Sequence, residues 1–388
     1  MQNSGESSLQ DQFVPSFVWR HPTRVRFGVG SLKTLTSEVA AIVPDGTRVF
    51  LVVGRQSLRA RGILQPILDS LRDYKVTVYD RVAPFPSPQA VDDATAECRS
   101  IEADIVVAIG GGSVMDLAKA VAILAVHEGS ALAFAQGEIA LVRKGLPFIA
   151  APTTSGSSSE VTSGSALWDM DAKKHYGLGG PLMFPDTAIV DPELMMSMPS
   201  SLAAITGMDA FTSAFESYWS IRSQPISDAL NLDVIRNFTA NLERSTIQGD
   251  LESRAACAIA STMSGIAYSQ SPPNACHAVG GPLTLFWDVQ HGQAVGVTLC
   301  GFLERAAPAI RHKLPPLWEA MGVEDLAGAT ELITRIMRRC GLETTLTGLG
   351  LNESDLDTLV DETRWERVGS LPVSMGRDEL RVMLAELF

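Results

Sequence analysis

Short runs of apolar residues alternate with longer mixed segments through the first half of the chain. Four such runs span residues 48–53, 75–79, 104–109 and 147–151. Continuous apolar runs of this length, bounded by turn-forming residues, are typical of strands buried on both faces of a parallel sheet. The segments between them are long enough for crossover helices. The pattern therefore predicts a doubly wound α/β domain.

The pattern changes after about residue 199. Strand-like runs become rare, and segments rich in Ala, Leu and Met take over, among them residues 251–268 and 314–340. The sequence at residues 200–203, with two serines before Leu and Ala, is typical of a capped helix start. We therefore predict an α/β domain over residues 1–197 and an all-helical domain over residues 198–388.

Composition and charge exclude several classes of protein. The 388 residues carry a formal net charge of −13, so the chain has no general attraction to nucleic acid or to an anionic membrane. It contains no run of 18 strongly apolar residues, and residues 1–13 lack the basic and apolar regions of a secretory signal. The five cysteines are scattered, which predicts reduced thiols in a cytoplasmic protein.

A glycine-rich turn follows the third apolar run. It consists of Gly110, Gly111, Gly112 and Ser113, and a helix-like segment comes next. Glycine lets the backbone approach a pyrophosphate closely, and the N–H groups at a helix start attract an anion. The spacing is not that of the G-x-G-x-x-G fingerprint, and a tight structural turn is the alternative. The strand before the turn and the helix after it favour phosphate binding.

A second polar turn follows the fourth apolar run. It contains Thr153, Thr154, Ser157 and Ser159. Hydroxyls and amides at the carboxyl end of a strand can line a nucleotide crevice, so these four are candidate cofactor-binding residues. On composition alone, a solvated serine-rich loop is the alternative.

The helical half contains residue types that suit a metal. Asp209 lies on a predicted helix, and His277 and His291 lie in segments that are unusual for plain helix packing. Two imidazoles and one carboxylate suit Fe²⁺ or Zn²⁺. The spacing alone leaves the alternative open, which is a solvated or capping aspartate and two ordinary histidines.

These motifs, in this order, resemble the iron-containing alcohol dehydrogenase family over nearly the whole chain. The matching motifs are the turn at 110–113 with Asp116 and Lys119, the turn at 152–160, Pro185-Asp186, Val190-Asp191-Pro192, Gly207-Met208-Asp209-Ala210, and His277 fourteen residues before His291-Gly292. Within the family, the chain is most similar to the phosphonoacetaldehyde reductases of phosphonate biosynthesis, on residues 166–169, 216–220, 274–278 and 281–284.

The resemblance implies a nucleotide-binding domain, a helical metal- and substrate-binding domain, and a cleft between them. It implies hydride transfer between a nicotinamide cofactor and an alcohol or aldehyde carbon. Asp209, His277 and His291 would be metal ligands and catalytic residues, and the metal, Fe²⁺ or Zn²⁺, would act as a Lewis acid on the substrate oxygen. Asp116 joins the expected cofactor-binding set. The resemblance also makes a homodimer an expectation.

The chain departs from the family pattern at three positions. Ser213 stands where the family has a fourth metal ligand, one helical turn after Asp209, and a hydroxyl is a poor ligand beside an imidazole. Three protein ligands plus water or substrate still make a workable catalytic site. Gly281 stands where the family has a cleft histidine, so the proton would come through water or the cofactor ribose. Ser158 replaces a glycine, which we expect to alter how the nicotinamide half sits.

The residues after the first apolar run bear on the choice of cofactor. NAD-preferring relatives tend to place an acid there to accept the ribose hydroxyls, whereas this chain has Gly54, Arg55 and Ser57. An acid would repel a 2′-phosphate, and an arginine and a hydroxyl would bind it. We therefore predict a preference for NADPH over NADH. The alternative is that Arg55 is an ordinary surface residue on a turn.

The favoured function is an NADPH-dependent, metal-assisted reductase of a small aldehyde, with reduction of phosphonoacetaldehyde to 2-hydroxyethylphosphonate as the candidate reaction. Lys174 and Asn274 are candidate contacts for the anionic group, although no spacing rule fixes them. A second interpretation is a metal-independent reductase or a non-redox lyase on the same scaffold, because two family imidazoles are missing. A third is a nucleotide-binding protein without turnover.

Overall fold

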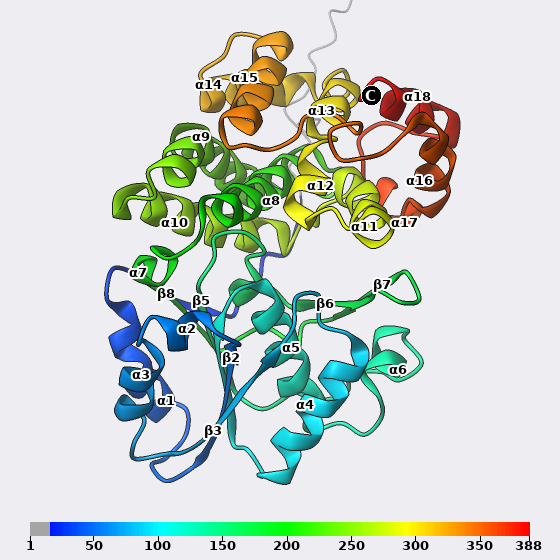
Figure 1. The fold of residues 1–388 in the computed structure, drawn as a ribbon. Coiled ribbons are helices and arrows are strands. Elements are labelled where there is room, and N and C mark those ends of the chain that lie inside the picture. Colours follow the sequence, from blue (N-terminus) through cyan, green and yellow to red (C-terminus); the bar gives the residue numbers. More distant parts are fainter. Residues whose placement is uncertain (1–15) are drawn as a thin grey trace, which may run out of the picture.

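A six-stranded parallel sheet forms the centre of the N-terminal domain (Figure 1). The structure is a computed structural model that describes residues 16–388, so the segment inspected for a secretory signal lies outside the described residues. In spatial order the strands are β1 (Arg24–Phe27), β8 (Thr187–Val190), β5 (Phe148–Pro152), β4 (Ile105–Gly110), β2 (Arg48–Gly54) and β3 (Lys75–Val82).

The four predicted strands are confirmed as β2, β3, β4 and β5. Each begins within one residue of its predicted start, because continuous burial makes these strands uniformly apolar. The four-residue strands β1 and β8 were not predicted from the apolar pattern. A separate antiparallel hairpin, β6 (Gly164–Asp169) and β7 (Lys174–Gly179), was not predicted either.

Helices cover both faces of the sheet, as a doubly wound fold requires. Alternate residues of β2 point to opposite faces: Val49 and Leu51 belong to one buried cluster, and Phe50 and Val52 to the other. The helices of this domain are α1 (Leu35–Ala40), α2 (Ser57–Ala60), α3 (Leu64–Ser70), α4 (Pro88–Ser100), α5 (Gly112–Leu124) and α6 (Ala131–Ala135). The first cluster contains residues of α1 and α3, and the second contains residues of α4 and α5, so each face has its own core.

The strand order places a crevice at the carboxyl ends of β2 and β4. From β2 the chain moves outward to β3, and it then crosses back to β4 on the other side of β2. Ligands of open α/β sheets bind where the order reverses in this way. The glycine turn after β4 and the segment after β2 therefore meet at the expected binding edge.

The second half of the chain forms a bundle of helices above the sheet domain (Figure 1). Its helices are α8 (Ser200–Trp219), α9 (Pro225–Ile247), α10 (Leu251–Tyr268), α11 (Ala275–Trp287), α12 (His291–Gly296), α13 (Leu299–Ala306), α14 (Leu314–Met321), α15 (Leu326–Arg339), α16 (Leu356–Glu362), α17 (Trp365–Val368) and α18 (Arg377–Ala385). No strand occurs after Val190 in the part of the chain that the structure describes. The predicted helical second half is therefore confirmed.

Two details of the predicted helices are wrong. Residues 314–340 form two helices rather than one, because Gly322 adopts a left-handed conformation (φ +69°) and ends α14. The helix at Ser200 begins where predicted, but its N-cap residue is Pro199 and no side chain caps it. Ala203, in the first turn, is buried in a cluster with residues of β8, α7 and α10.

The change from sheet to helices occurs between β8 and α8. The short helix α7 (Pro192–Met195) lies between them. We propose that the domain boundary lies at residues 197/198, within this connection. All five cysteines lie among the described residues and are free thiols. None of the helices in residues 16–388 combines the length and apolar character needed to cross a bilayer.

Candidate active site

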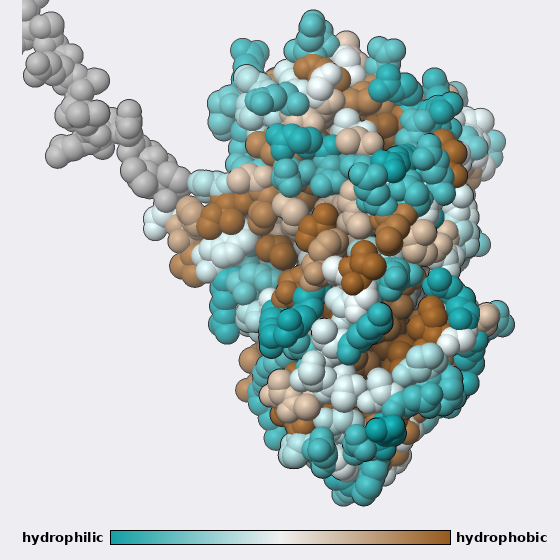
Figure 2. All heavy atoms as spheres, turned by 90° about the vertical axis from the view of Figure 1, so that its left-hand side faces the viewer, coloured by the Kyte–Doolittle hydropathy of each residue, from teal (hydrophilic) through white to brown (hydrophobic). Residues whose placement is uncertain are grey.

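One cavity of about 980 Å³ lies between the two domains and brings most of the predicted site residues together. Figure 2 shows a hollow lined by apolar side chains near the level at which the domains meet. The predicted residues that line the cavity are Ser57, Gly111, Gly112, Ser113, Asp116, Thr153, Thr154, Ser157, Ser159, Asp209, Ser213, His277, Gly281 and His291. Five predicted residues do not line it: Gly54, Arg55, Gly110, Lys174 and Asn274.

The glycine turn and the second polar turn pack directly against each other at the sheet end of the cavity. Helix α5 begins at Gly112, and a Cβ at this position would lie 2.9 Å from Ser157 Oγ. A Cβ at this distance would force the Ser157 side chain to move, so glycine allows the two turns to approach each other closely. The free amides at the start of α5 face the cavity between these turns, an arrangement suited to a phosphate.

Asp116 and Lys119 connect α5 to the polar turn and to the β6–β7 hairpin. Asp116 accepts hydrogen bonds from Ser159 Oγ (2.7 Å) and from the Ala166 amide (3.2 Å). Lys119 is fully buried and donates to Ser159 Oγ (2.8 Å) and to the Gly164 carbonyl (2.7 Å). Burial raises the pKa of Asp116, although the nearby Lys119 opposes this effect. Both side chains are thus engaged within the protein and position the walls of the cavity.

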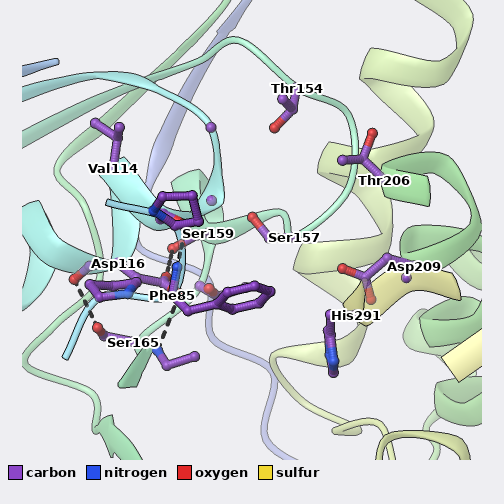
Figure 3. Close-up of a pocket in the computed structure, with 18 of the residues that line it drawn as sticks. Phe85, Val114, Asp116, Thr154, Ser157, Ser159, Ser165, Thr206, Asp209 and His291 are labelled. Carbon is purple, nitrogen blue, oxygen red and sulfur yellow. Dashed lines mark hydrogen bonds between the residues drawn. The ribbon is translucent and has the colours of Figure 1, made fainter. Parts of the chain in front are cut away.

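Three helices of the second domain contribute a compact set of potential metal ligands. Asp209 comes from α8, His277 from the first turn of α11, and His291 is the first residue of α12. One ligand atom of each lies within 4.8 Å of the others, and His277 Nε2 is 3.3 Å from Asp209 Oδ1. In Figure 3, Asp209 and His291 lie together on the side of the cavity opposite Asp116 and Ser165. The predicted cluster therefore converges at the domain interface.

Glu216, which the sequence motifs did not single out as a site residue, holds His277 from behind. It is fully buried on α8, and its carboxylate accepts hydrogen bonds from the backbone amides of Asn274 (2.9 Å) and Cys276 (2.6 Å). The Nδ1–H of His277 also donates to this carboxylate. A carboxylate in this position fixes the ring so that Nε2 faces Asp209, which is how histidine ligands are usually oriented.

The charges around the two histidines favour a cation between them. Burial opposes protonation of His277, but the carboxylates of Glu216 and Asp209 outweigh it and raise the pKa of His277 to about 9. Burial, together with the neighbouring His277, lowers the pKa of His291 to about 4. Asp209 stays ionised because its hydrogen bond to His277 overcomes burial and lowers its pKa. Metals bind the neutral imidazole and the ionised carboxylate, so His291 and Asp209 are already in the binding state and His277 would release its proton when a cation binds.

The residues present fit a divalent cation. His291 Nδ1 is buried and has no hydrogen-bond partner among residues 16–388, although a buried polar atom needs one. Two nitrogens and one carboxylate oxygen form a ligand set for Fe²⁺ or Zn²⁺ with an open fourth position. Ser213 lines the same space one turn after Asp209, so the structure places it where the missing fourth ligand was expected.

The two residues predicted to contact substrate lie elsewhere. Asn274 is fully buried, with its side chain bonded to Trp219 Nε1 (2.9 Å) and to the Glu216 carbonyl (3.0 Å). Lys174 is exposed at the start of β7. Neither residue lines the cavity, since Asn274 is held by packing and Lys174 faces solvent, so a substrate contact by either stays a prediction.

Ser158 preserves the backbone shape that a glycine would give. Its φ of +50° lies in the left-handed region, and its hydroxyl donates to the Ser261 carbonyl of α10 (2.6 Å). The side chain is buried and does not line the cavity. The Ser158 side chain therefore makes no direct contact with the cavity through which it could alter the position of the nicotinamide.

Several cavity residues were missed because they come from segments without a recognised motif. A wall of aromatic rings runs from the hairpin to the histidines: Trp168 packs on His175 (ring centroids 4.2 Å apart) and on His291 (5.6 Å). Arg364 and Arg367, at and within α17, also line the cavity. Trp168 lies in residues 166–169, which carried the subfamily resemblance, whereas the arginines had no sequence signal.

Comparison with known proteins agrees with this arrangement. The model of the iron-containing alcohol dehydrogenases matches residues 22–192, and the model of their C-terminal domain matches residues 203–385. The chain is 33% identical to a choline dehydrogenase of Bacillus subtilis over 80% of its own length and 78% of the relative. It belongs to the iron-containing alcohol dehydrogenase family. The protein is accordingly an alcohol/aldehyde oxidoreductase that uses a nicotinamide cofactor.

Two further members of this family are similar over nearly their whole length. A sulfoacetaldehyde reductase of Bilophila wadsworthia is 27% identical, over 96% of this chain and 99% of the relative. The crystal structure of a sulfoacetaldehyde reductase from Bifidobacterium kashiwanohense in complex with NAD⁺ superposes with a TM-score of 0.91. That structure is 29% identical and covers 96% of this chain and 99% of the other.

Proposed function

We propose that this dehydrogenase is an NADPH-dependent, metal-assisted reductase of a small aldehyde, with phosphonoacetaldehyde as the candidate substrate and 2-hydroxyethylphosphonate as the product. The observation that carries the proposal is a single cavity that joins the glycine turn to the cluster of Asp209, His277 and His291. A cofactor held at one end and a carbonyl held at the other would share this space.

Each part of the chain then has a definite task. The amides at the start of α5 bind the cofactor phosphates, and the packed turns fix their position. Asp209, His277 and His291 hold the cation, with Glu216 orienting His277. When bound, the cation supplies Lewis acidity towards the substrate oxygen, and the reduced nicotinamide supplies the hydride. The buried ring of Trp168 lines this end of the cavity and would limit access of water to the reacting carbon.

The proposed preference for NADPH rests on the charges near the end of β2. Among residues 16–388, the carboxylates that line the cavity are Asp116 and Asp209, and neither follows β2. Ser57 lines the cavity there, together with Arg61, whereas Arg55 is exposed near them. A 2′-phosphate at this edge would meet a hydroxyl and positive charge rather than an acid.

A panel of aldehydes tests the reaction. The purified enzyme should oxidise NADPH with phosphonoacetaldehyde, and kcat/KM should exceed that with NADH. Metal analysis should find Fe²⁺ or Zn²⁺ near one ion per chain, and chelation should abolish turnover until the ion is restored. Turnover that survives complete removal of metal would favour the metal-independent interpretation. NADPH binding without oxidation of NADPH by any aldehyde would favour a non-catalytic nucleotide-binding protein.

Two broader expectations accompany the proposal. The family resemblance supports a homodimer, which light scattering of the purified protein measures. The five free thiols support a cytoplasmic location. Neither expectation bears on the chemistry of the cavity.

A further inference from the structure

Two arginines enter the cavity at the end that holds the histidines, and the mechanism above uses neither. Arg364 immediately precedes α17, and Arg367 lies within it. Helix α17 packs against α11, which carries His277 (Figure 1). The Arg364 amide donates to the carbonyl of Ala278, the residue after His277 (3.2 Å). The short segment that carries both arginines is thus held against the helix that provides a proposed metal ligand.

The Arg364 side chain occupies the space beside Gly281. A Cβ at Gly281 would lie 3.9 Å from Arg364 Cδ, so a longer side chain there would compete with the arginine for room. Arg364 Nη1 donates to His175 Nδ1 (2.5 Å), and its Nε donates to Glu366 (2.9 Å). Glu366 is two-thirds exposed, so this ion pair lies at the solvent side of the arginine. Position 281, where the family has a histidine, is a glycine here, and the Arg364 side chain lies next to it in the cavity.

Arg367 has fewer polar partners than Arg364. Its guanidinium makes no hydrogen bond and no ion pair with any residue in 16–388. Burial and the adjacent Arg364 charge lower the pKa of Arg367 to about 10, so it remains positively charged at neutral pH. Glu216 attracts it at longer range, but the Glu216 carboxylate is already bonded to His277 and to the amides of α11. Arg367 is partly buried and lines the cavity, so an anion bound there would give its guanidinium a charged partner.

The arginines are close to the groups that would handle the aldehyde. Burial, followed by the charges of Arg364 and Arg367, lowers the pKa of His175, and the Trp168 ring packs on both His175 and His291. His175 therefore accepts the Arg364 hydrogen bond as a neutral ring. The cavity that these arginines line also contains His277 and His291, so an aldehyde held at the histidines would share that space with the two cations.

We propose that Arg364 and Arg367 form a subsite for a tetrahedral oxyanion, a phosphonate or a sulfonate, carried on the carbon next to the aldehyde group. The subsite rests on the proposed aldehyde reduction and names the class of its substrate. Guanidinium groups bind such oxyanions through paired, charge-assisted hydrogen bonds. The subsite supplies the positive contacts that Lys174 and Asn274 do not.

Steady-state kinetics of the metal-loaded enzyme with NADPH test the subsite. The substrates are phosphonoacetaldehyde, sulfoacetaldehyde and 3,3-dimethylbutanal, a neutral aldehyde with the same branched shape. In Arg367→Gln and Arg364→Gln, KM for the anionic aldehydes should rise roughly 10- to 100-fold, the range for a lost hydrogen bond to a charged group. KM for the neutral aldehyde should change by less than about threefold, well below that range. Arg367→Lys should recover part of the loss, and Arg381→Gln, on exposed α18, is the matched control.

Binding measurements separate this subsite from the proposed reaction. Calorimetry with methylphosphonate and methanesulfonate, on the enzyme with NADP⁺, should show binding that Arg367→Gln abolishes and Arg367→Lys retains in part. If the wild type reduces no aldehyde but binds these anions through Arg367, the proposed reaction fails and the subsite stands. The subsite is refuted if the wild type reduces aldehydes but Arg364→Gln and Arg367→Gln raise KM equally for neutral and anionic aldehydes. It is also refuted if these variants change KM for neither class of aldehyde. The anion that binds with the higher affinity shows whether the subsite prefers a phosphonate or a sulfonate.

Discussion

The two ends of the cavity are built in different ways. At the sheet end, the proposed phosphate-binding amides belong to the turn after β4, which packs against the turn after β5, and residues that follow β2 and β3 also line the cavity. At the helical end, it is made of side chains from α8, α11 and α12, which lie up to 82 positions apart in the sequence. A backbone surface depends on local chain geometry, whereas a side-chain cluster depends on how the whole helical domain packs.

This difference explains where the chain departs from its family. Substitution in the glycine turn disturbs its packing, because a Cβ at Gly112 would force the Ser157 side chain to move. Ser213 and Gly281, by contrast, replace family histidines without disturbing the helices that carry them. Side chains that face a cavity can change while the fold stays intact, so the helical end is where specificity can diverge.

The largest expected effect comes from breaking the helical end. His291→Ala removes one of three proposed ligands and should reduce kcat/KM by roughly 10²- to 10³-fold, the cost of losing one group that stabilises a developing oxyanion. Metal content should fall with it, while binding of NADPH, measured by fluorescence titration, should stay within about twofold. Full metal content and activity in this variant would contradict the proposed ligand set.

A second test of the helical end adds a metal ligand instead of removing one. Ser213→His places an imidazole one turn after Asp209, on the cavity side of α8. Metal affinity, measured by competition with a chelator, should increase at least about 10-fold, since even outer partners of ligands change it 10- to 100-fold. Ser213→Ala is the control and should leave affinity unchanged. A loss of affinity in Ser213→Ala would mean that the hydroxyl itself is a ligand.

The same contrast decides what could be predicted from the sequence. The glycine turn was found because strand, turn and helix are contiguous, and β2 to β5 were found because strands buried on both faces read as unbroken apolar runs. Strands β1 and β8 are too short to show such a pattern, and the break at Gly322 looks like an ordinary helical position.

The roles of Glu216, Arg364 and Arg367 depend on contacts between segments far apart in the chain. Glu216 meets His277 across 61 positions, and Arg364 meets His175 across 189. A spacing rule can propose Asp209, His277 and His291 as a set, but it cannot show which charged residues surround them. For the same reason it assigned substrate contacts to Lys174 and Asn274, which tertiary packing directs elsewhere.

A smaller effect is expected from disturbing the sheet end. Gly112→Ala introduces the contact with Ser157 and should raise KM for NADPH by about tenfold, consistent with the cost of overpacking. Metal content should not change. The double variant Gly112→Ala/Ser157→Gly removes the Ser157 side chain that the new Cβ would contact. The increase in its KM for NADPH should therefore be smaller than the increases of Gly112→Ala and Ser157→Gly added together. If the effects of the two single substitutions on KM simply add in the double variant, the contact between positions 112 and 157 is not the reason for the glycine.

The smallest expected effect concerns Ser158, where this chain departs from its family at the sheet end. Ser158→Ala keeps the left-handed backbone conformation but loses the hydrogen bond to Ser261, which should cost about 1 kcal/mol and lower Tm by about 1–2 °C. Ser158→Gly loses the same bond but relieves the backbone conformation, so its Tm should lie above that of Ser158→Ala. KM for NADPH should stay within about twofold of the wild type in both variants, because the side chain does not line the cavity. A large rise in KM for NADPH with unchanged Tm would show that Ser158 acts on the cofactor after all.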